Sequence, residues 1–333
     1  MIARTRPIDG DLSSLWRRGS ARRLALALQG GGAHGAYTWG VLDRLLELEG
    51  LEVDAVSGTS AGALNAVALA SGWLAGGPAG ARAALEAVWR SVSSGAGPLI
   101  DELSHVRLFA MSLTTHLFSP YDLNPLDLNP VREVLVRAVD FARLRAATAP
   151  TVLVAATDVQ NAEPRIFANA ELTPEAVLAS ATLPQLHRAV EIDGRAYWDG
   201  GYTANPPVLA LAERTRASDL LLVRINPRTT EHVPKRAPAI RNRMAEIVFG
   251  EPLRQELARL EELQALGRRP LGWLDRRLRR LARLRLSIID GDDHLSTLSP
   301  ATRLHPDWPL LQQLRDAGRS AAEGWLAERG WVA

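Results

Sequence analysis

A serine in a tight turn is the first feature of the sequence that could do chemistry. The pentapeptide Gly58-Thr59-Ser60-Ala61-Gly62 matches the pattern G-x-S-x-G. Glycines two residues before and two residues after the serine allow a strand to turn sharply into a helix and leave the hydroxyl exposed. A strand is expected just before it, at 53–56, and an alanine-rich helix just after it, at 61–71. This setting favours a nucleophilic Ser60 over a serine that merely occupies a turn.

A glycine-rich stretch, Gly30-Gly31-Gly32-Ala33-His34-Gly35, could bind an anion. It follows an expected strand and opens a helix, and such a loop presents backbone N–H groups and the positive end of the helix dipole. If the first two strands are parallel neighbours, both loops emerge at one edge of the sheet, beside Ser60. The loop would then hold the oxyanion formed when the serine attacks a carbonyl. The expected oxyanion residues are Gly30, Gly31, Gly32 and Gly35.

The same loop also fits G-x-G-x-x-G, the fingerprint of a dinucleotide site. It lacks the lysine of a nucleoside-triphosphate loop, so that interpretation fails. A dinucleotide site needs an acidic residue at the far end of the second strand, to bind the ribose. Asp54 instead begins that strand, and residues 57–60 occupy the end of it. A dinucleotide-binding oxidoreductase therefore stays as the alternative function.

The serine needs a base, and a carboxylate is the better candidate. Asp199-Gly200-Gly201 follows an expected strand at 195–198, and glycines after an acid permit close approach by a substrate or another loop. A structural turn is the alternative for this motif taken alone. A histidine base would instead come from His232, His294 or His305, which lie in or beyond a proline-rich boundary.

Composition excludes several other classes of function. The 333 residues include 39 basic and 37 acidic side chains, so no large net field recruits nucleic acid. There is no cysteine, which excludes thiolate metal sites and a cysteine nucleophile. No run approaches the roughly 18 apolar residues of a membrane-spanning helix, and the N-terminal stretch lacks the apolar core of a secretory signal. We expect a cytoplasmic protein, at most peripherally bound to membrane, whose ester hydrolysis requires no metal or cofactor.

The elements that must position these residues alternate between strands and helices. Two strand–helix units at the start imply a parallel sheet. Further expected strands lie at 151–157, 165–168 and 220–225. Between 91 and 130 the pattern lapses, and the tetrapeptide DLNP occurs twice, at Asp122 and Asp127; we interpret this segment as an insertion or lid.

Together, the glycine loop, the G-x-S-x-G turn and the Asp-Gly-Gly motif resemble the patatin-like phospholipase family. Their order and approximate spacing agree with that family over about residues 24–226, and Asn205-Pro206 also looks like a segment near its acid. The resemblance implies a three-layer α/β/α core with a mainly parallel sheet, and a lipid acyl hydrolase. It further implies a dyad of Ser60 and Asp199 without a histidine. The implied motif residues are Gly58, Thr59, Ala61 and Gly62 around the serine, and Gly200 and Gly201 after the acid.

One position departs from the pattern. The family usually has Arg or Lys before the last glycine of the loop, and this chain has His34. A neutral imidazole supplies less positive charge than either, so we expect from His34 a pH-sensitive contribution or none.

The rest of the chain is expected to form an arm at 1–23, a proline-rich linker at 227–238 and an arginine-rich helical extension at 239–333. The segment from Arg268 to Arg285 holds eight arginines and one acid, with leucines at helical spacing. It is either an interfacial helix on an anionic membrane or an amphipathic helix that covers the core. A noncatalytic membrane-associated protein is therefore a second alternative.

Overall fold

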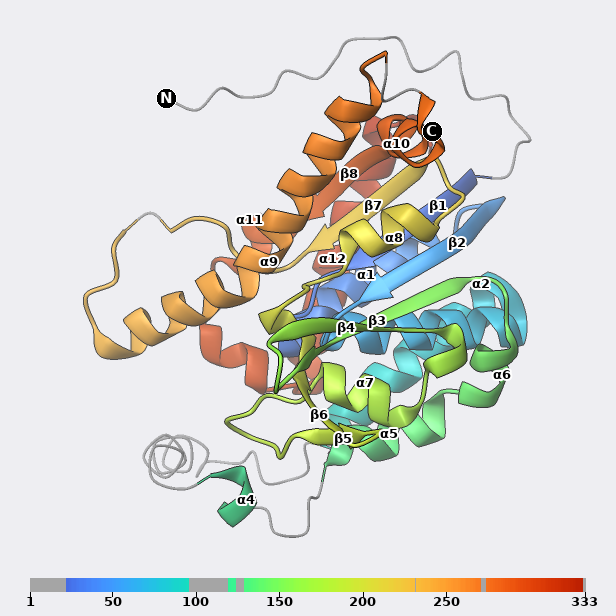
Figure 1. Ribbon diagram of the computed structural model, residues 1–333. Coiled ribbons are helices and arrows are strands. Elements are labelled where there is room, and N and C mark those ends of the chain that lie inside the picture. The colour runs from blue at the N-terminus through green and yellow to red at the C-terminus, as the bar shows by residue number, and fades with distance from the viewer. Residues whose placement is uncertain (1–21, 96–118, 124–128, 231, 271–273, 332–333) are drawn as a thin grey trace.

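The computed structural model describes residues 22–95, 119–123, 129–230, 232–270 and 274–331. They form three layers, in which a central sheet lies between two layers of helices (Figure 1). The strands are β1 (Arg22–Leu28), β2 (Leu51–Gly58), β3 (Thr151–Asp158), β4 (Glu163–Ala168), β5 (Val190–Ile192), β6 (Arg195–Asp199), β7 (Asp219–Arg224) and β8 (Arg285–Asp290). The longer helices are α1 (Gly35–Leu45), α2 (Ala61–Gly95), α5 (Pro130–Ala138), α6 (Phe141–Ala146), α7 (Pro174–Ser180), α8 (Val208–Arg214), α9 (Ala237–Gly267), α10 (Arg276–Arg283) and α12 (Trp308–Glu328). Short helices are α4 (Pro120–Leu123), α11 (Asp292–Leu295) and the 3-10 turns Gly32–His34, Asn169–Glu171, Gly200–Tyr202 and Pro300–Leu304.

The sheet is mostly parallel, as the sequence predicts. Its order is β5-β6-β3-β2-β1-β7-β8, with β4 paired to β3. Strands β3, β2, β1, β7 and β8 run parallel, whereas β4, β5 and β6 add antiparallel pairs at one side. The predicted mixed α/β fold with a mainly parallel sheet is therefore confirmed.

Strand β1 shows how the sequence fixes the two layers of helices. Because side chains alternate across a strand, its leucines and alanines face opposite sides. The leucines pack in the larger core beneath α1, α2 and α12, and the alanines pack in the smaller core beneath α8, α9 and α10. Small side chains on the second face let those helices approach the sheet closely. The leucines are Leu24, Leu26 and Leu28, and the alanines are Ala25 and Ala27.

Strand β3 brings two distant segments together. It pairs with β4 in a hairpin along one edge, which leaves the other edge to both β2 and β6. On that edge β2 runs parallel to β3 and ends where Gly58 pairs with Val154. From the opposite direction, β6 ends where Asp199 pairs with Ala156. The carboxyl ends of β2 and β6 therefore meet across Ala155, although more than a hundred residues separate them in sequence.

Helix α2 is longer than the expected 61–71 segment and contains a break. Gly76 and Gly77 have non-helical backbone angles, and Gly77 has a φ of 62°. Pro78 follows at once, where its fixed φ suits the first turn of a new helical segment. The first helical segment of α2 thus continues, after this break, into a second segment that carries the buried Trp89.

Strand β8 lies in the region 239–333 that the sequence analysis expected to be helical. It pairs in parallel with β7 at the edge of the sheet. Its apolar residues follow directly on an arginine-rich helix, so their short run resembles a continuation of the leucine stripe. The boundaries proposed at 24–226 and 227–238 stay predictions, while the sheet itself continues beyond them.

Two of the predicted segments fall largely outside the described residues. Of the arm at 1–23, only Arg22 and Arg23 are described, and they begin β1. Of the insertion at 91–130, the described parts are the end of α2, the short α4 and the start of α5. The interpretation of this insertion as a lid stays a prediction.

The arginine-rich segment 268–285 packs against the core through its described leucines. Leu281 and Leu284 are buried in the smaller core. Arg277 forms an ion pair with Glu213 and lies on the outer surface. Residues 271–273 lie outside the described part of the chain. These contacts fit an amphipathic helix that covers the sheet.

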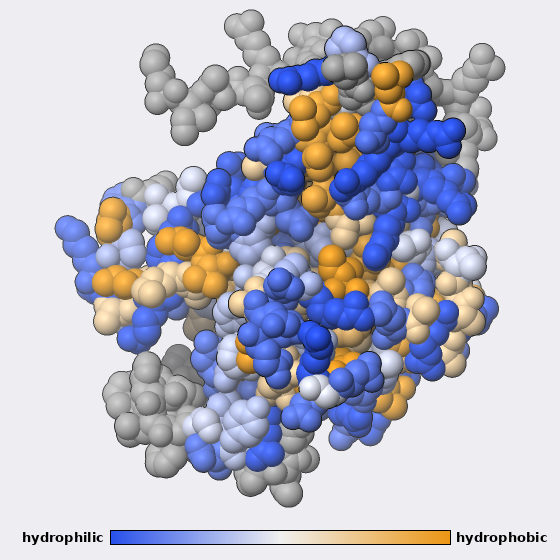
Figure 2. Space-filling model, in the orientation of Figure 1, coloured by the Kyte–Doolittle hydropathy of each residue, from blue (hydrophilic) through white to orange (hydrophobic). Residues whose placement is uncertain are grey.

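The first half of α9 projects away from the sheet and exposes apolar side chains (Figures 1 and 2). Ile240, Met244, Ile247 and Val248 are all exposed. In the second half, Leu253 and Leu260 are buried against the core. None of the described helices is long and apolar enough to cross a membrane.

Helices α1 and α12 cross closely because glycines stand at their contact. A Cβ on Gly318 of α12 would overlap the carbonyl oxygen of Tyr37 on α1. We expect Gly318→Ala to lower the free energy of unfolding by about 1–3 kcal/mol, since overpacking forces the helices apart. Gly324 lies six residues on, is exposed and has open space at its Cβ position.

Gly324→Ala is the matched control and should raise the free energy of unfolding by about 0.5–1 kcal/mol, because alanine is the better helix former. Urea denaturation of both variants measures the difference. Equal effects of the two substitutions would contradict the close crossing.

Candidate active site

The predicted serine lies at a strained turn between β2 and α2. Ser60 has a φ of 55°, in the left-handed region that non-glycine residues rarely occupy. Its backbone N–H donates to Ser180 Oγ at 2.9 Å, and the hydroxyl of Thr59 donates to the carbonyl of Ala204 at 2.6 Å. These bonds hold a conformation that the local sequence would not adopt alone.

Close backbone contacts require glycine at both glycine positions of this turn. A Cβ on Gly58 would overlap the carbonyl oxygen of Gly62, and a Cβ on Gly62 would overlap the carbonyl oxygen of Leu28. The turn is therefore packed directly on the end of β1.

The glycine loop after β1 lies against the serine turn. A Cβ on Gly30 would stand 2.6 Å from the carbonyl oxygen of Thr59 and 2.8 Å from the Cβ of Ser60. Gly32 has a φ of 61°, and a Cβ there would overlap the carbonyl oxygen of Arg303. The structure thus brings together the two loops that the sequence analysis expected at one edge.

The four glycines expected to hold an oxyanion differ in the state of their amides. Gly30 donates its N–H to Asn205 Oδ1 at 2.8 Å, and the N–H of Gly35 points back to the carbonyls of the preceding 3-10 turn. Among the described residues, the amides of Gly31 and Gly32 donate no hydrogen bond. Only these two are free to bind an anion, and Gly30 and Gly35 serve to shape the loop.

His34, which departs from the family pattern, is buried and neutral. Its Nε2 lies 2.8 Å from Thr302 Oγ1, and that hydroxyl already donates to Ser299 O. The imidazole must therefore donate through Nε2. Burial, with the positive charge of Arg303 nearby, lowers the pKa of His34 to about 4. Of the two expectations for this residue, the structure favours no charged contribution near neutral pH.

Asp199 is held at the end of β6 by its backbone and by one carboxylate oxygen. Its N–H donates to Thr182 O at 2.8 Å, and its carbonyl accepts from Thr157 Oγ1 at 2.8 Å. The N–H of Gly201 donates to Oδ1 at 2.7 Å. Gly200 packs on the carbonyl of Ala155, the residue across which β2 and β6 meet.

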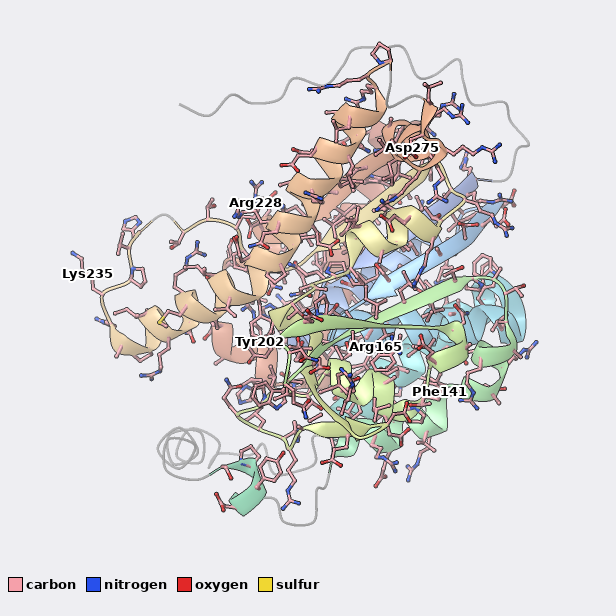
Figure 3. The ribbon with its side chains drawn as sticks, in the orientation of Figure 1. Phe141, Arg165, Tyr202, Arg228, Lys235 and Asp275 are labelled. Atoms are coloured by element: carbon pink, nitrogen blue, oxygen red, sulfur yellow. The ribbon has the colours of Figure 1, made fainter. Side chains whose placement is uncertain are left out.

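Helix α9 covers the carboxylate from solvent. A Cβ on Gly201 would overlap the ring of Phe249, whose centroid lies 4.7 Å from that of Tyr202. Tyr202, in the turn that follows β6, is labelled in Figure 3. The carbonyl of Phe249 also accepts from Asn205 Nδ2 at 3.0 Å. As a result, Asp199 is only 1% exposed.

This burial raises the pKa of Asp199 to about 7. The hydrogen bond from the Gly201 amide and the nearby Ser60 hydroxyl both oppose this rise. Oδ2 makes no hydrogen bond of standard geometry with any described residue. Such bonds are often long or misaligned until a substrate binds.

A pocket of about 390 Å³ opens over these groups. Ser60, Asp199 and Gly30–Gly32 line it. Most of the other lining residues are apolar and come from α2, α5, α9 and the segments 181–187 and 300–306. The apolar members include Leu64, Trp89, Val92, Val131, Leu183, Leu186, Phe249 and Leu304. Such a lining suits an acyl chain beside a polar reacting group.

Sequence analysis missed residues that complete the site from outside its motifs. Asn205 lies in a segment that the family resemblance pointed to, but neither its hydrogen bond to Gly30 nor that of Ser180 to Ser60 could be read from spacing. Arg303 comes from the turn Pro300–Leu304, well beyond the region of resemblance. Nothing in its local sequence marks it as a pocket residue.

The alternative bases and ligands have other roles in the described structure. His34 is hydrogen-bonded to Thr302 and His305 to the carbonyl of Ala301, while His187 lines the pocket. Asp54 lies inside β2, which begins at Leu51 and not at Asp54 as the sequence analysis expected. It accepts from the Thr215 hydroxyl at 2.6 Å and from the amides of Arg216 and Ala217, so it anchors the loop before β7. No group of three or more histidine or acidic side chains suited to a metal occurs in the described ranges.

The structure thus combines a serine turn, a glycine loop and a buried acid around one pocket at an edge of a mostly parallel α/β sheet. A family model described as patatin-like phospholipase matches residues 26–212, more than half of the chain. The chain therefore belongs to the patatin-like phospholipase family, which consists of lipid acyl hydrolases, and the resemblance seen in its motifs is confirmed.

Among solved structures, the chain is similar to VipD from Legionella pneumophila, with 16% sequence identity and a TM-score of 0.38. That match covers 88% of this chain and 67% of VipD. No curated protein sequence matches the chain significantly.

The buried carboxyl makes stability depend on pH. In the unfolded chain Asp199 ionises near its ordinary pKa of 3.8, whereas in the fold it stays protonated up to about 7. The unfolded state loses its proton first, so stability falls as the pH rises between these values. Because Asp199→Asn cannot ionise, we expect its melting temperature to exceed that of the wild type at pH 8, by an excess that shrinks toward pH 4.

Asp193→Asn, in the exposed turn between β5 and β6, controls for the loss of one surface carboxylate. Calorimetry at several pH values measures each difference. A difference for Asp199→Asn that did not change with pH would contradict the raised pKa.

Proposed function

We propose that the chain is a serine esterase that hydrolyses acyl ester bonds of lipids through a dyad of Ser60 and Asp199. The observation that carries this proposal is that β2 and β6 meet on one edge of β3 and that Ser60 and Asp199 both line the same apolar pocket. The free amides of Gly31 and Gly32 in the wall of the same pocket support an oxyanion hole.

In the proposed mechanism, ionised Asp199 takes the proton of the Ser60 hydroxyl as the oxygen attacks the ester carbonyl. The carbonyl π electrons move to its oxygen, and the resulting oxyanion accepts hydrogen bonds from the two free amides. Collapse of this intermediate expels the alcohol, which takes the proton from Asp199. Water then attacks the acyl-serine by the same steps, with Asp199 again as the base, and releases the fatty acid.

Burial gives Asp199 a useful basicity. A carboxylate with an ordinary pKa is a weak base at neutral pH, whereas one that is too deeply buried stays protonated. A pKa of about 7 lies between these limits. The apolar cover that Phe249 and Tyr202 provide is therefore part of the proposed chemistry.

We further propose that residues 268–285 contact an anionic membrane by electrostatic attraction, without inserting into it. The described leucines Leu281 and Leu284 are buried and cannot insert into lipid. Arginines of α10 remain exposed, and each cation near an anionic surface contributes about 1 kcal/mol of attraction. A noncatalytic protein that only binds membrane is distinguished from this proposal by the labelling experiment below.

A fluorophosphonate probe should label the wild-type protein at Ser60, because an activated serine attacks the phosphorus as it would a carbonyl. We expect Ser60→Ala to abolish labelling. Ser94→Ala, on the exposed end of α2, should leave it intact. Labelling that persists in Ser60→Ala would remove this serine as the nucleophile, and absence of labelling in the wild type would favour the noncatalytic alternative.

The pH profile tests the base. Because Asp199 must be ionised, kcat/KM for a p-nitrophenyl ester should rise about ten-fold per pH unit below pH 7 and level off above it. Asp199→Asn should lower turnover by about 10²- to 10⁴-fold and abolish this rise. A comparable loss in His187→Gln, with an unchanged profile in Asp199→Asn, would instead identify a histidine base.

A further inference from the structure

Arg303 is a largely buried cation with few groups to neutralise it. Its side chain is 20% exposed, and its one ion pair among the described residues is with Glu246 at 4.0 Å. Glu246 lies closer to Arg243, at 3.1 Å. The Nε of Arg303 is buried and has no hydrogen-bond partner.

Arg303 stands beside the glycine loop. Its carbonyl oxygen occupies the space that a Cβ on Gly32 would need, and the 3-10 turn that carries it packs on the loop. It lines the pocket together with Ser60 and Asp199, and it is the only arginine or lysine among the described lining residues. Because His34 is neutral, Arg303 is the positive charge of this part of the pocket.

An under-paired guanidinium in a pocket favours an anionic ligand. Partial burial removes water from the group, and its hydrogen bonds are then left unmet unless a ligand accepts them. The planar fork of guanidinium N–H groups matches the oxygens of a phosphate. A neutral ester offers no such group, whereas an ester of a phosphorylated glycerol does.

We propose that Arg303 forms an anion subsite that binds the phosphate of the lipid substrate. This inference rests on the proposed esterase function and adds a substrate preference to it. Arg303 acts here by binding and positioning the substrate, and no bond to it is made or broken. The same chemistry would also bind free phosphate, so the experiment separates the two sources.

The test uses two substrates with identical acyl chains, dioctanoyl phosphatidic acid and dioctanoylglycerol. Each is assayed with the wild type, with Arg303→Gln and with Arg303→Lys. The ratio of kcat/KM for the phosphate-bearing substrate to that for the neutral substrate should fall about ten-fold or more in Arg303→Gln, mainly through KM. Arg303→Lys should retain part of the preference, because it keeps the charge but loses the fork. Arg259→Gln removes an exposed arginine of α9 and controls for net charge.

Two kinetic outcomes would overturn the subsite. Equal loss of kcat on both substrates would mean that Arg303 stabilises the reaction oxyanion, which both substrates form. An unchanged ratio would mean that Arg303 does not contact the phosphate. A large fall in the melting temperature of Arg303→Gln would also count against the proposal, since removal of an under-paired buried charge should preserve or raise it.

A binding measurement keeps the subsite separate from the proposed catalysis. In Ser60→Ala, calorimetry should show tighter binding of dioctanoyl phosphatidic acid than in Ser60→Ala combined with Arg303→Gln. If that difference is found but the wild type hydrolyses neither lipid, the esterase function fails and the anion subsite stands. If inorganic phosphate binds through Arg303 and the phosphate-bearing lipid shows no preference over the neutral one, the assignment to the substrate is overturned.

Discussion

The pairing of two strands with one edge of β3 is the constraint on which the site depends. β2 and β6 approach along that edge from opposite directions and stop at Gly58 and Asp199, on either side of Ala155. Hydrogen-bond register fixes this meeting to within one residue, since a shift by one would turn every side chain to the other face. The distance between the serine turn and the acid is therefore set by the backbone, and the side chains need little freedom to come together.

The same arrangement explains how the fold accommodates the ionisable carboxyl of Asp199 in a buried site. Asp199 is held through its own N–H and carbonyl, and Gly201 bonds one carboxylate oxygen. The bond from Gly201 lowers the pKa of Asp199, and burial raises it more strongly. The fold thus accepts a cost in stability at neutral pH, which is a usual price of placing a basic carboxylate in a pocket that excludes water.

Segments far from the motifs complete the pocket. The turn Pro300–Leu304 packs on the glycine loop at Gly32, and α9 lies over Gly201. Both follow the proline-rich stretch that the sequence analysis proposed as a boundary, and β8 adds a strand there. The region beyond 239 therefore contributes one strand to the sheet and two segments to the lining of the pocket.

The sequence by itself determined the local conformations and the family. The glycines at 58 and 62 and the glycine loop after β1 predict a sharp turn and a tight loop from the sequence alone. The structure gives the reason for these glycines, because a Cβ at each of these positions would contact neighbouring atoms too closely. Short continuous apolar runs likewise predicted the central strands, since a strand buried on both faces is apolar throughout. Only the tertiary structure decided which loop amides are free, that His34 is neutral, and that Arg303 joins the pocket. These properties depend on partners such as Asn205 and Thr302, which lie 175 and 268 residues from the groups they bind, and no local pattern encodes a contact at that separation.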